Sequence, residues 1–282
     1  MITRLRHFIG TTLRKWLQPG HFYRIPFGPA RGQFVEFHPE DNLDILFGFH
    51  EPNTFEVFRQ LVKPGMVVAD IGANHGYFSV FLNKLVGPNG LVYAFEPVPN
   101  TFAVLQRTVA QNGASFVKPV CAAVSNQNKP VSFYLSHSHY MASLDAKWAK
   151  TPDEKIEVQG VRLDTFFQAE GKRPDFIKMD IEGGGVFALE GIQTLIIEHQ
   201  PFLLLESHTP EEDQAIGQSL LSADYAVYRV GSSVPLDDLT SDYRDLKGIW
   251  GTVVGLPKTK LAQLQGFSPQ RFQKQRLGQR GK

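Results

Sequence analysis

Residues 66–101 are the stretch that most restricts how this 282-residue chain can fold. A run of apolar residues typical of a buried strand covers 66–71, and a glycine turn follows at 72–76. A helix pattern comes next, and then a second apolar strand that ends on Glu96. Such a βαβ unit predicts a parallel sheet, and it offers a nucleoside-containing ligand free backbone N–H groups and one carboxylate for the ribose hydroxyls.

The glycine spacing indicates which nucleoside ligand binds. A dinucleotide fingerprint has a middle glycine, so that the backbone can approach a pyrophosphate. Asn74 stands at that place between Gly72 and Gly76, where its side chain would crowd a diphosphate but could hydrogen-bond an amino-acid tail. Asp70 suits a cationic ligand, and Glu96 lies where a ribose carboxylate belongs. We therefore predict S-adenosylmethionine, which carries a sulfonium and no phosphate; the alternative is a βα unit whose glycine turn binds no ligand.

Three motifs along the chain resemble those of one family. They read DIGANHGYFS at 70–79, FEPVPN at 95–100 and DFIKMDIEG at 175–183. In this order, and over about residues 62–206, they resemble the FkbM-type S-adenosylmethionine-dependent methyltransferases. The resemblance implies an O-methyltransferase that acts on a hydroxyl of a sugar, a glycan or a secondary metabolite.

Strand and helix patterns alternate from Met66 onward, which predicts an α/β fold. We expect a Rossmann-like, doubly wound sheet of seven strands of the class I methyltransferase type, with the central order 3-2-1-4-5 and one antiparallel strand. Two strands of an insertion are predicted over 131–135 and 156–163. The further main strands and the helices are predicted over 116–120, 176–179, 202–205, 225–230 and 250–256, and over 55–62, 100–112, 186–196 and 211–221. The predicted domains are an N-terminal extension at 1–60, a methyltransferase domain at 61–257 and a basic, disordered tail at 258–282.

Polar side chains at two further strand ends are the candidate catalytic residues. Ligands of an open α/β sheet lie outside the carboxyl ends of its strands, where the strand order reverses. Asp180 ends the fourth main strand, which places it beside the Gly72 turn and the methionine half of the cofactor. Glu206 and His208 follow the fifth strand and are expected to be exposed over the acceptor pocket. The predicted cofactor-binding residues are Asp70, Gly72, Asn74, Gly76, Glu96, Pro97 and Asp180.

The loop after Asp180 departs from the pattern of the family it resembles. That pattern continues Glu-Gly-Ala-Glu, whereas this chain has Glu182 and then glycines at 183–185. Glu182 could act at the site or cap the next helix, and the sequence leaves both open. Carboxylates here could bind a divalent cation with Glu206 or His208, but the departure removes one acid, and no metal ligand is assigned. A non-catalytic cofactor-binding or partner-docking protein therefore stays an alternative.

Basic residues concentrate at both ends of the chain. Residues 1–35 contain six Lys and Arg, residues 258–282 contain seven, and neither segment contains an acid. These ends could contact an anionic membrane surface or nucleic acid, fold back on the acidic middle of the chain, or remain solvated. Apolar residues at helical spacing over 2–17 predict a basic amphipathic helix, which could equally pack on the catalytic domain or on a dimer partner.

Other features bound the location and the partners. Cys121 is the only cysteine, and no apolar run approaches the ~20 residues that span a bilayer. We expect a cytoplasmic protein, with peripheral membrane contact and a homo-oligomer as options, that acts on a small-molecule or glycan acceptor. His137, His139 and Tyr140 could line the acceptor pocket or lie on a surface loop. A nucleic-acid methyltransferase is disfavoured because no Asn-Pro-Pro-Tyr-like or Pro-Cys signature occurs, and a dehydrogenase is disfavoured by Asn74.

Overall fold

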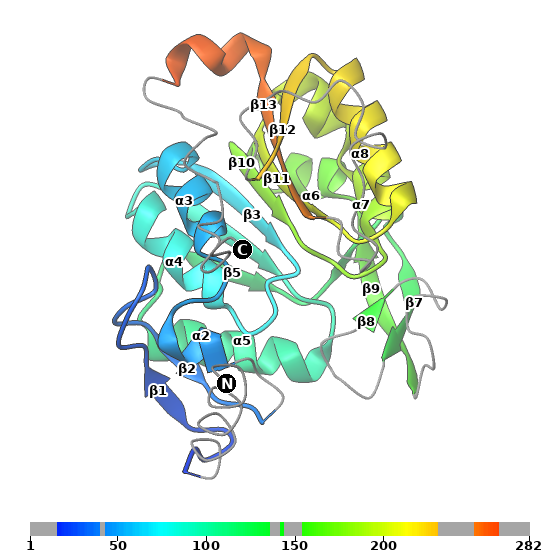
Figure 1. Ribbon diagram of the computed structural model, residues 1–282. Coiled ribbons are helices and arrows are strands. Elements are labelled where there is room, and N and C mark those ends of the chain that lie inside the picture. Colours follow the sequence, from blue (N-terminus) through cyan, green and yellow to red (C-terminus); the bar gives the residue numbers. More distant parts are fainter. Residues whose placement is uncertain (1–15, 40–42, 136–141, 144–153, 231–250, 265–282) are drawn as a thin grey trace, which may run out of the picture.

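The computed structural model describes residues 16–39, 43–135, 142–143, 154–230 and 251–264, and its centre is a seven-stranded sheet (Figure 1). The strand order is β12-β13-β11-β10-β3-β4-β5. β13 runs antiparallel to both of its neighbours, and the other pairs are parallel. The bounds are β3 Val67–Ile71, β4 Leu91–Phe95, β5 Val117–Val120, β10 Phe176–Met179, β11 Phe202–Ser207, β12 Tyr225–Arg229 and β13 Gly251–Pro257. The predicted doubly wound fold, its 3-2-1-4-5 order and its single antiparallel strand are confirmed.

Side chains alternate between the two faces of this sheet and bury each face under helices. Along β3, Val68 packs into one hydrophobic cluster and Ala69 into the other. The first face is covered by α3 (Pro52–Leu61), α4 (Tyr77–Val86) and α5 (Pro99–Gln111). The opposite face is covered by α6 (Leu163–Ala169), α7 (Gly185–Gly191) and α8 (Pro210–Ser222), as Figure 1 shows. Because apolar side chains and helices cover both faces of the sheet, we expect polar ligands to bind at the ends of the strands.

The described part of the N-terminal segment packs on the α4–α5 side of the sheet. It contains β1 (Phe22–Arg24), β2 (Phe34–Glu36) and α2 (Leu43–Phe47). Ile25 and Phe37 are buried in the same cluster as Val68 of β3. The Arg107 guanidinium of α5 donates two hydrogen bonds of 2.7 Å each to the Glu36 carboxylate. The segment is therefore continuous with the core, and the boundary at residue 60 stays a prediction.

The insertion forms a separate four-stranded sheet in the order β6-β9-β7-β8. Its strands are β6 Ala123–Val124, β7 Pro130–Leu135, β8 Ala142–Ser143 and β9 Glu154–Val161. β9 ends earlier than predicted, because Leu163 begins α6, where the Asp164 carboxylate accepts a hydrogen bond from the Leu195 backbone N–H. α7 is also shorter than predicted: it ends at Gly191, and a π-helical turn, η1 (Leu195–His199), leads into β11.

The two basic ends are described only in part. After β13 follows a 3-10 helix, η2 (Lys258–Gln263), whose Lys260 ammonium donates to the Gln200 carbonyl, between η1 and β11, at 2.6 Å. The disordered tail predicted over 258–282 thus begins with a structured segment at 258–264. Residues 265–282 lie outside the described residues, as do most of the predicted helix over 2–17 and His137, His139 and Tyr140. No helix among the described residues has the length and apolar character needed to cross a membrane.

Candidate active site

A pocket of about 230 Å³ opens where the strand order reverses, between the carboxyl ends of β3, β4 and β10. Its lining residues are Gly72, Asn74, Glu96, Pro97, Val98, Thr101, Phe133, Asp180, Ile181 and Glu182. A larger pocket of about 600 Å³ lies between α6 and η1, the elements that precede β10 and β11. Ligands of doubly wound sheets bind at the carboxyl ends of the strands, so the smaller pocket is the candidate cofactor site.

Glu96 is the most constrained polar group of this pocket. One carboxylate oxygen accepts a hydrogen bond from the Asn74 backbone N–H at 3.1 Å, and the other accepts one from the Val98 N–H at 3.0 Å. Burial raises the pKa of this carboxyl to about 7, against the lowering effect of the two N–H groups. Each oxygen keeps a second lone pair, so the carboxylate can accept two further hydrogen bonds from ribose hydroxyls.

Three residues of the turn at 72–76 are in the left-handed region of backbone conformation, and two of them, Gly72 and Asn74, line the pocket. Gly72 has φ +75°, and a Cβ placed on it would lie 1.9 Å from the Asp180 carbonyl oxygen. Only glycine therefore allows the loops after β3 and β10 to approach each other this closely. Asn74 has φ 48°, and its side-chain oxygen accepts a hydrogen bond from the His75 N–H at 2.7 Å. All five N–H groups of residues 72–76 are hydrogen-bonded within the protein, so the expectation of free backbone N–H groups at this turn is wrong.

The charge of the pocket fits S-adenosylmethionine. Glu96, Asp180 and Glu182 contribute carboxylates, and none of the described residues that line the pocket is Lys or Arg. A sulfonium and an ammonium are attracted by such a lining, whereas the pyrophosphate of a dinucleotide is repelled. The residues present therefore suit this cofactor and not NAD.

Two residues predicted to bind the cofactor lie outside the pocket lining. Asp70 is fully buried; its carboxylate accepts a hydrogen bond from Ser79 Oγ and lies 3.5 Å from the Lys178 ammonium. Gly76 is the N-cap of α4, with φ +88°, and a Cβ on it would lie 2.8 Å from a Leu105 methyl group. Both residues therefore contact neighbouring protein groups around the turn, and a direct contact of either residue with the cofactor stays a prediction.

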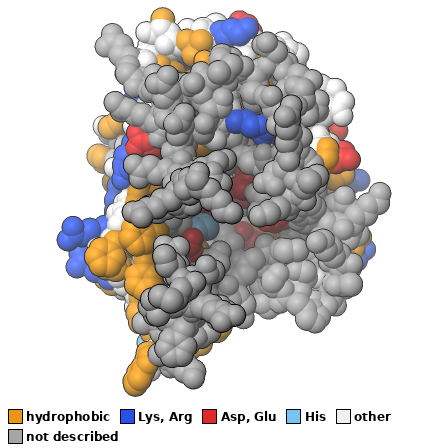
Figure 2. All heavy atoms as spheres, in the orientation of Figure 1, with side chains coloured by type: hydrophobic (Ala, Val, Ile, Leu, Met, Phe, Trp, Pro, Cys, Tyr) orange, Lys and Arg blue, Asp and Glu red, His pale blue; other side chains and the backbone are white. Residues whose placement is uncertain are grey.

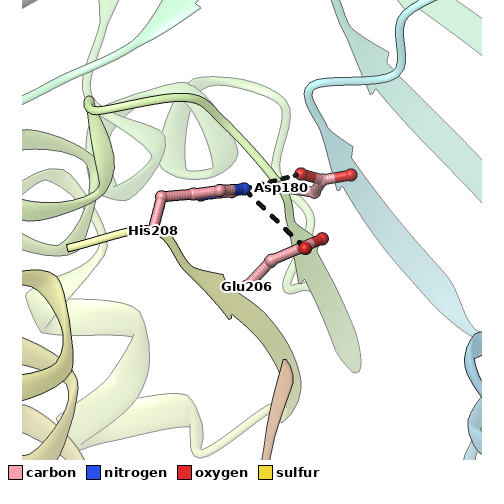
Figure 3. Close-up of side chains that lie close together, drawn as sticks. All are labelled: Asp180, Glu206 and His208. Atoms are coloured by element: carbon pink, nitrogen blue, oxygen red, sulfur yellow. Dashed lines mark ion pairs between the residues drawn. The ribbon is translucent and has the colours of Figure 1, made fainter. Parts of the chain in front are cut away.

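Asp180, Glu206 and His208 are brought together at the ends of two neighbouring strands (Figure 3). β10 and β11 are paired so that Met179 lies opposite Leu205. His208 Nε2 lies 3.8 Å from Asp180, 3.7 Å from Glu206 and 3.8 Å from Glu182. The expectation of an exposed histidine is wrong: the side chain is 7% exposed, because α8 folds back over it. One imidazole nitrogen therefore faces three carboxylates.

Lys178 is a charged group of this cluster that the sequence reasoning missed. It lies on β10 and is buried, with its ammonium 3.4 Å from the Asp180 carboxylate and 5.2 Å from the centre of the Phe78 ring. Burial alone would lower its pKa, but Asp180 and Asp70 outweigh burial and raise it, so the group stays a cation. The sequence feature that could have indicated this group is a lysine within the apolar run of a buried strand.

The pKa values of Asp180 and Glu206 are shifted in opposite directions. Burial raises the pKa of Glu206, and the neighbouring Asp180 carboxylate raises it further. Burial would also raise the pKa of Asp180, but the Lys178 ammonium and His208 outweigh burial and lower it. Near neutral pH the pair therefore holds one ionised carboxylate and one protonated carboxyl. Such a division is typical of acid and base pairs in active sites.

The N-terminal segment adds a fourth carboxylate, which sequence reasoning also missed. Glu51 raises the pKa of Glu206 through its charge, after burial and Asp180. It is the N-cap of α3 in a left-handed conformation, φ 41°, and accepts a hydrogen bond from Thr54 Oγ1 at 3.0 Å. His50 beside it pairs with Glu51 at 3.2 Å. Figure 2 shows acidic side chains and a histidine at the centre of the face that carries these segments.

The cluster also meets a geometric condition for a divalent cation. Asp180, Glu206 and His208 each offer one ligand atom, and these atoms lie within 4.8 Å of one another. The Lys178 ammonium, however, already neutralises Asp180 from 3.4 Å. The possibility of a divalent cation stays untested, and we assign no metal ligand.

The doubly wound sheet has one antiparallel strand and an acidic pocket at its switch point, which is the architecture of class I S-adenosylmethionine-dependent methyltransferases. A sequence model of the FkbM methyltransferase domain matches residues 70–237. The chain belongs to the FkbM methyltransferase family, whose cofactor is S-adenosylmethionine. The predicted family and cofactor are confirmed.

Individual relatives are distant. The chain is 27% identical over 160 residues to 31-O-demethyl-FK506 methyltransferase FkbM of Streptomyces tacrolimicus, covering 47% of this chain and 61% of that protein. It is 27% identical over 155 residues to methyltransferase sdnD of Sordaria araneosa, covering 44% and 60%. The crystal structure of methyltransferase FkbM from Methylobacillus flagellatus KT is 18% identical with a TM-score of 0.45, covering 76% and 55%. The chain thus spans about three fifths of the length of these curated relatives.

Proposed function

We propose that this protein transfers the methyl group of S-adenosylmethionine to a hydroxyl oxygen of a sugar, a glycan or a secondary metabolite. One observation carries the proposal: Asp180, Glu206 and His208 converge beside the cofactor pocket, and Asp180 also forms its wall. The printed name of one relative, 31-O-demethyl-FK506 methyltransferase, supports oxygen as the acceptor atom.

The donor half of the site binds the cofactor through Glu96, Pro97 and the turn that contains Gly72 and Asn74. The Glu96 carboxylate accepts hydrogen bonds from the ribose hydroxyls, and Asp180 attracts the positive charges of the methionine half. When bound, the cofactor supplies an electrophilic methyl group whose bond to sulfur breaks with the electron pair left on sulfur. Holding the two reactants in line can contribute ~7–11 kcal/mol, so positioning is the main task of this pocket.

His208 acts as the general base. Its Nε2 takes the hydroxyl proton as the acceptor oxygen becomes an ether oxygen. The imidazolium that forms is stabilised by the carboxylates of Asp180 and Glu182, each 3.8 Å away. Protonated Glu206 donates a hydrogen bond to the acceptor, and ionised Asp180 orients the hydroxyl. General-base help of this kind is worth ~10²–10⁴-fold in rate.

The charge of the acceptor side selects the class of acceptor. Glu51, Asp180 and Glu206 lie near one buried ammonium, that of Lys178, and Glu182 lies 3.8 Å from His208 Nε2. An acceptor with phosphate groups is repelled there, which disfavours nucleic acid, whereas a neutral or cationic polyhydroxyl compound is accommodated.

The test combines binding and transfer. Calorimetry with S-adenosylhomocysteine is expected to give a micromolar Kd. S-adenosylmethionine with a labelled methyl group, offered with sugars, glycans, polyketides and oligonucleotides, is expected to label a hydroxyl oxygen. Micromolar NAD binding without S-adenosylhomocysteine binding contradicts the methyltransferase proposal, and label on nucleic acid contradicts the acceptor class. Tight binding with no transfer to any acceptor supports the non-catalytic alternative.

A further inference from the structure

Glu212 is a buried carboxylate that neither the family motifs nor the proposed chemistry uses. It lies in the first turn of α8 and is 2% exposed. One of its oxygens accepts a hydrogen bond from the Gly185 backbone N–H at 2.9 Å, and the other accepts one from the His208 N–H at 2.7 Å. The second oxygen also lies 3.9 Å from His208 Nδ1. A buried carboxylate is costly unless it is hydrogen-bonded, so these contacts determine where it sits.

The start of α8 explains how the carboxylate reaches this place. Thr209 is the N-cap of α8 and accepts a hydrogen bond from the Glu212 N–H at 3.1 Å. In a capping box the glutamate at this position returns to the N–H of the cap residue itself. Here Glu212 instead bonds the residue before the cap, His208, and the start of a second helix, α7. The carboxylate therefore serves a contact between two elements.

Those two contacts join the two walls of the acceptor site. His208 follows β11, and Gly185 follows the loop that carries Glu182 after β10. The N-cap of α7, Gly184, makes no side-chain cap, so the N–H of the next residue is bonded from α8. Both loops are thereby held to one carboxylate.

Gly185 leaves the space that this carboxylate fills. A Cβ at Gly185 would lie 2.8 Å from Glu212 Oε1 and 2.9 Å from its carboxyl carbon. Side-chain β-carbons essentially never approach other atoms this closely, so a larger residue at 185 displaces Glu212. The departure from the Glu-Gly-Ala-Glu pattern thus removes an acid at residue 185 of α7, and Glu212 of α8 contacts this position.

We propose that Glu212 is a positioning residue, which holds His208 and the Glu182–Gly185 loop at the separation that methyl transfer requires. The proposal rests on the proposed role of His208 as base. It assigns no contact between Glu212 and the cofactor or acceptor. Glu212 acts through the backbone at His208 and Gly185 and through the imidazole.

Four variants test this assignment. Glu212→Ala removes both contacts, Glu212→Gln keeps one acceptor oxygen, and Gly185→Ala displaces the carboxylate without altering it. The double variant Gly185→Glu with Glu212→Gly returns a carboxylate to α7. Glu211→Ala is the matched control, because Glu211 is an exposed acid in the same helical turn.

Binding and amide exchange give a first readout that needs no acceptor. We expect the Kd of S-adenosylhomocysteine to stay within about twofold in every variant, because neither Gly185 nor Glu212 lines the cofactor pocket and the variants leave Glu96 unchanged. Hydrogen exchange of the His208 and Gly185 amides is expected to accelerate roughly tenfold or more in Glu212→Ala and Gly185→Ala, but not in Glu211→Ala. The imidazole ¹⁵N signals of His208 should move in the same variants. Unchanged exchange and unchanged signals overturn the proposal, even if methyl transfer is never detected.

Kinetics give the second readout. Once an acceptor is identified, kcat is expected to fall roughly tenfold or more in Glu212→Ala and Gly185→Ala. The kcat of Glu212→Gln should lie between these values and that of wild type. The KM for the cofactor should change little in all three variants. The effects of Gly185→Ala and Glu212→Ala should not add, because both remove one contact. The relocated carboxylate should restore part of the rate. If Glu212→Ala does not fold, Glu212→Gln and Gly185→Ala carry the test. Additive losses of kcat in the two variants, or a parallel loss of S-adenosylhomocysteine binding, would show that Glu212 has only a structural role.

Discussion

The donor half of the site, at the ends of β3 and β4, and the acceptor half, at the ends of β10 and β11, are built in different ways. In the donor half, backbone N–H groups hold one carboxylate, Glu96, and the absent side chain of Gly72 allows two loops to touch. In the acceptor half, charged side chains face one another around His208. A backbone-built half depends on conformation, whereas a half built from side chains depends on charge balance and can be retuned by single substitutions. Substitutions in the donor half should therefore change cofactor binding, and substitutions in the acceptor half should change the rate of methyl transfer.

The largest expected effect is on the acceptor half alone. His208→Ala should lower the rate of methyl transfer by ~10²–10⁴-fold, because the proton acceptor is lost. The Kd of S-adenosylhomocysteine should stay within about twofold, because His208 does not line the cofactor pocket. Labelled methyl transfer and calorimetry measure the two quantities, and His21→Ala, at an exposed histidine, is the control. An unaltered rate would remove His208 from the mechanism.

Gly72→Ala should break the donor half through its backbone. The added Cβ would meet the Asp180 carbonyl at 1.9 Å and would also strain a backbone with φ +75°. We expect the free energy of unfolding to fall by about 3 kcal/mol. Gly113→Ala is the matched control: its φ is +58°, but no atom lies within 4 Å of the added Cβ, so a loss of about 1 kcal/mol is expected. Denaturant unfolding measures both, and equal losses would show that the close approach to Asp180 is unimportant.

Glu96→Ala should weaken cofactor binding with no direct effect on acid–base chemistry. Removing the acceptor of two ribose hydroxyls is expected to raise the Kd of S-adenosylhomocysteine roughly tenfold to hundredfold. Glu198→Ala, an exposed acid on η1, serves as the control in the same calorimetric titration. A Kd within about twofold of wild type would mean that the ribose is held elsewhere.

The pH dependence of binding should come from the donor half. A raised pKa of about 7 means that Glu96 is largely neutral at pH 6 and largely ionised at pH 8. Ribose hydroxyls bond best to the ionised form, so affinity for S-adenosylhomocysteine should rise about tenfold from pH 6 to pH 8 as the carboxyl loses its proton. The same titration with Glu96→Gln should be nearly flat across this range. A wild-type affinity that falls with pH would contradict the assignment.

The smallest expected effect concerns metal. Because the Lys178 ammonium lies 3.4 Å from Asp180, we expect a chelator and added Mg²⁺ to change methyl transfer by less than about twofold. A tenfold stimulation by Mg²⁺ that is lost in Glu206→Gln would instead show that the acceptor half binds a cation.

The donor half could be predicted from the sequence because its parts are local. Residues 66–101 contain the strand, the turn, the helix and the ribose carboxylate, and their periodicity alone specifies the order in which they pack. Asp70 shows the limit of this reasoning. It ends the same strand, but Lys178 lies opposite it in the register of β10 against β3, and its carboxylate turns toward that ammonium and Ser79 instead of the pocket.

The sequence predicted where the acceptor half lies but not how its side chains are arranged. Strand order placed Asp180, Glu206 and His208 on one edge of the sheet. The burial of His208, the arrival of Glu51 from the N-terminal segment and the contact of Glu212 with Gly185 depend on how α3, α7 and α8 pack.

The sequence by itself therefore determined the fold class, the family and the methyl donor, because each follows from patterns within a short length of chain. Only the tertiary structure decided which carboxylate is ionised, which is protonated and which holds the histidine in place. The physical reason is that pKa and positioning depend on burial and on distances of a few ångströms between groups that lie far apart in the sequence.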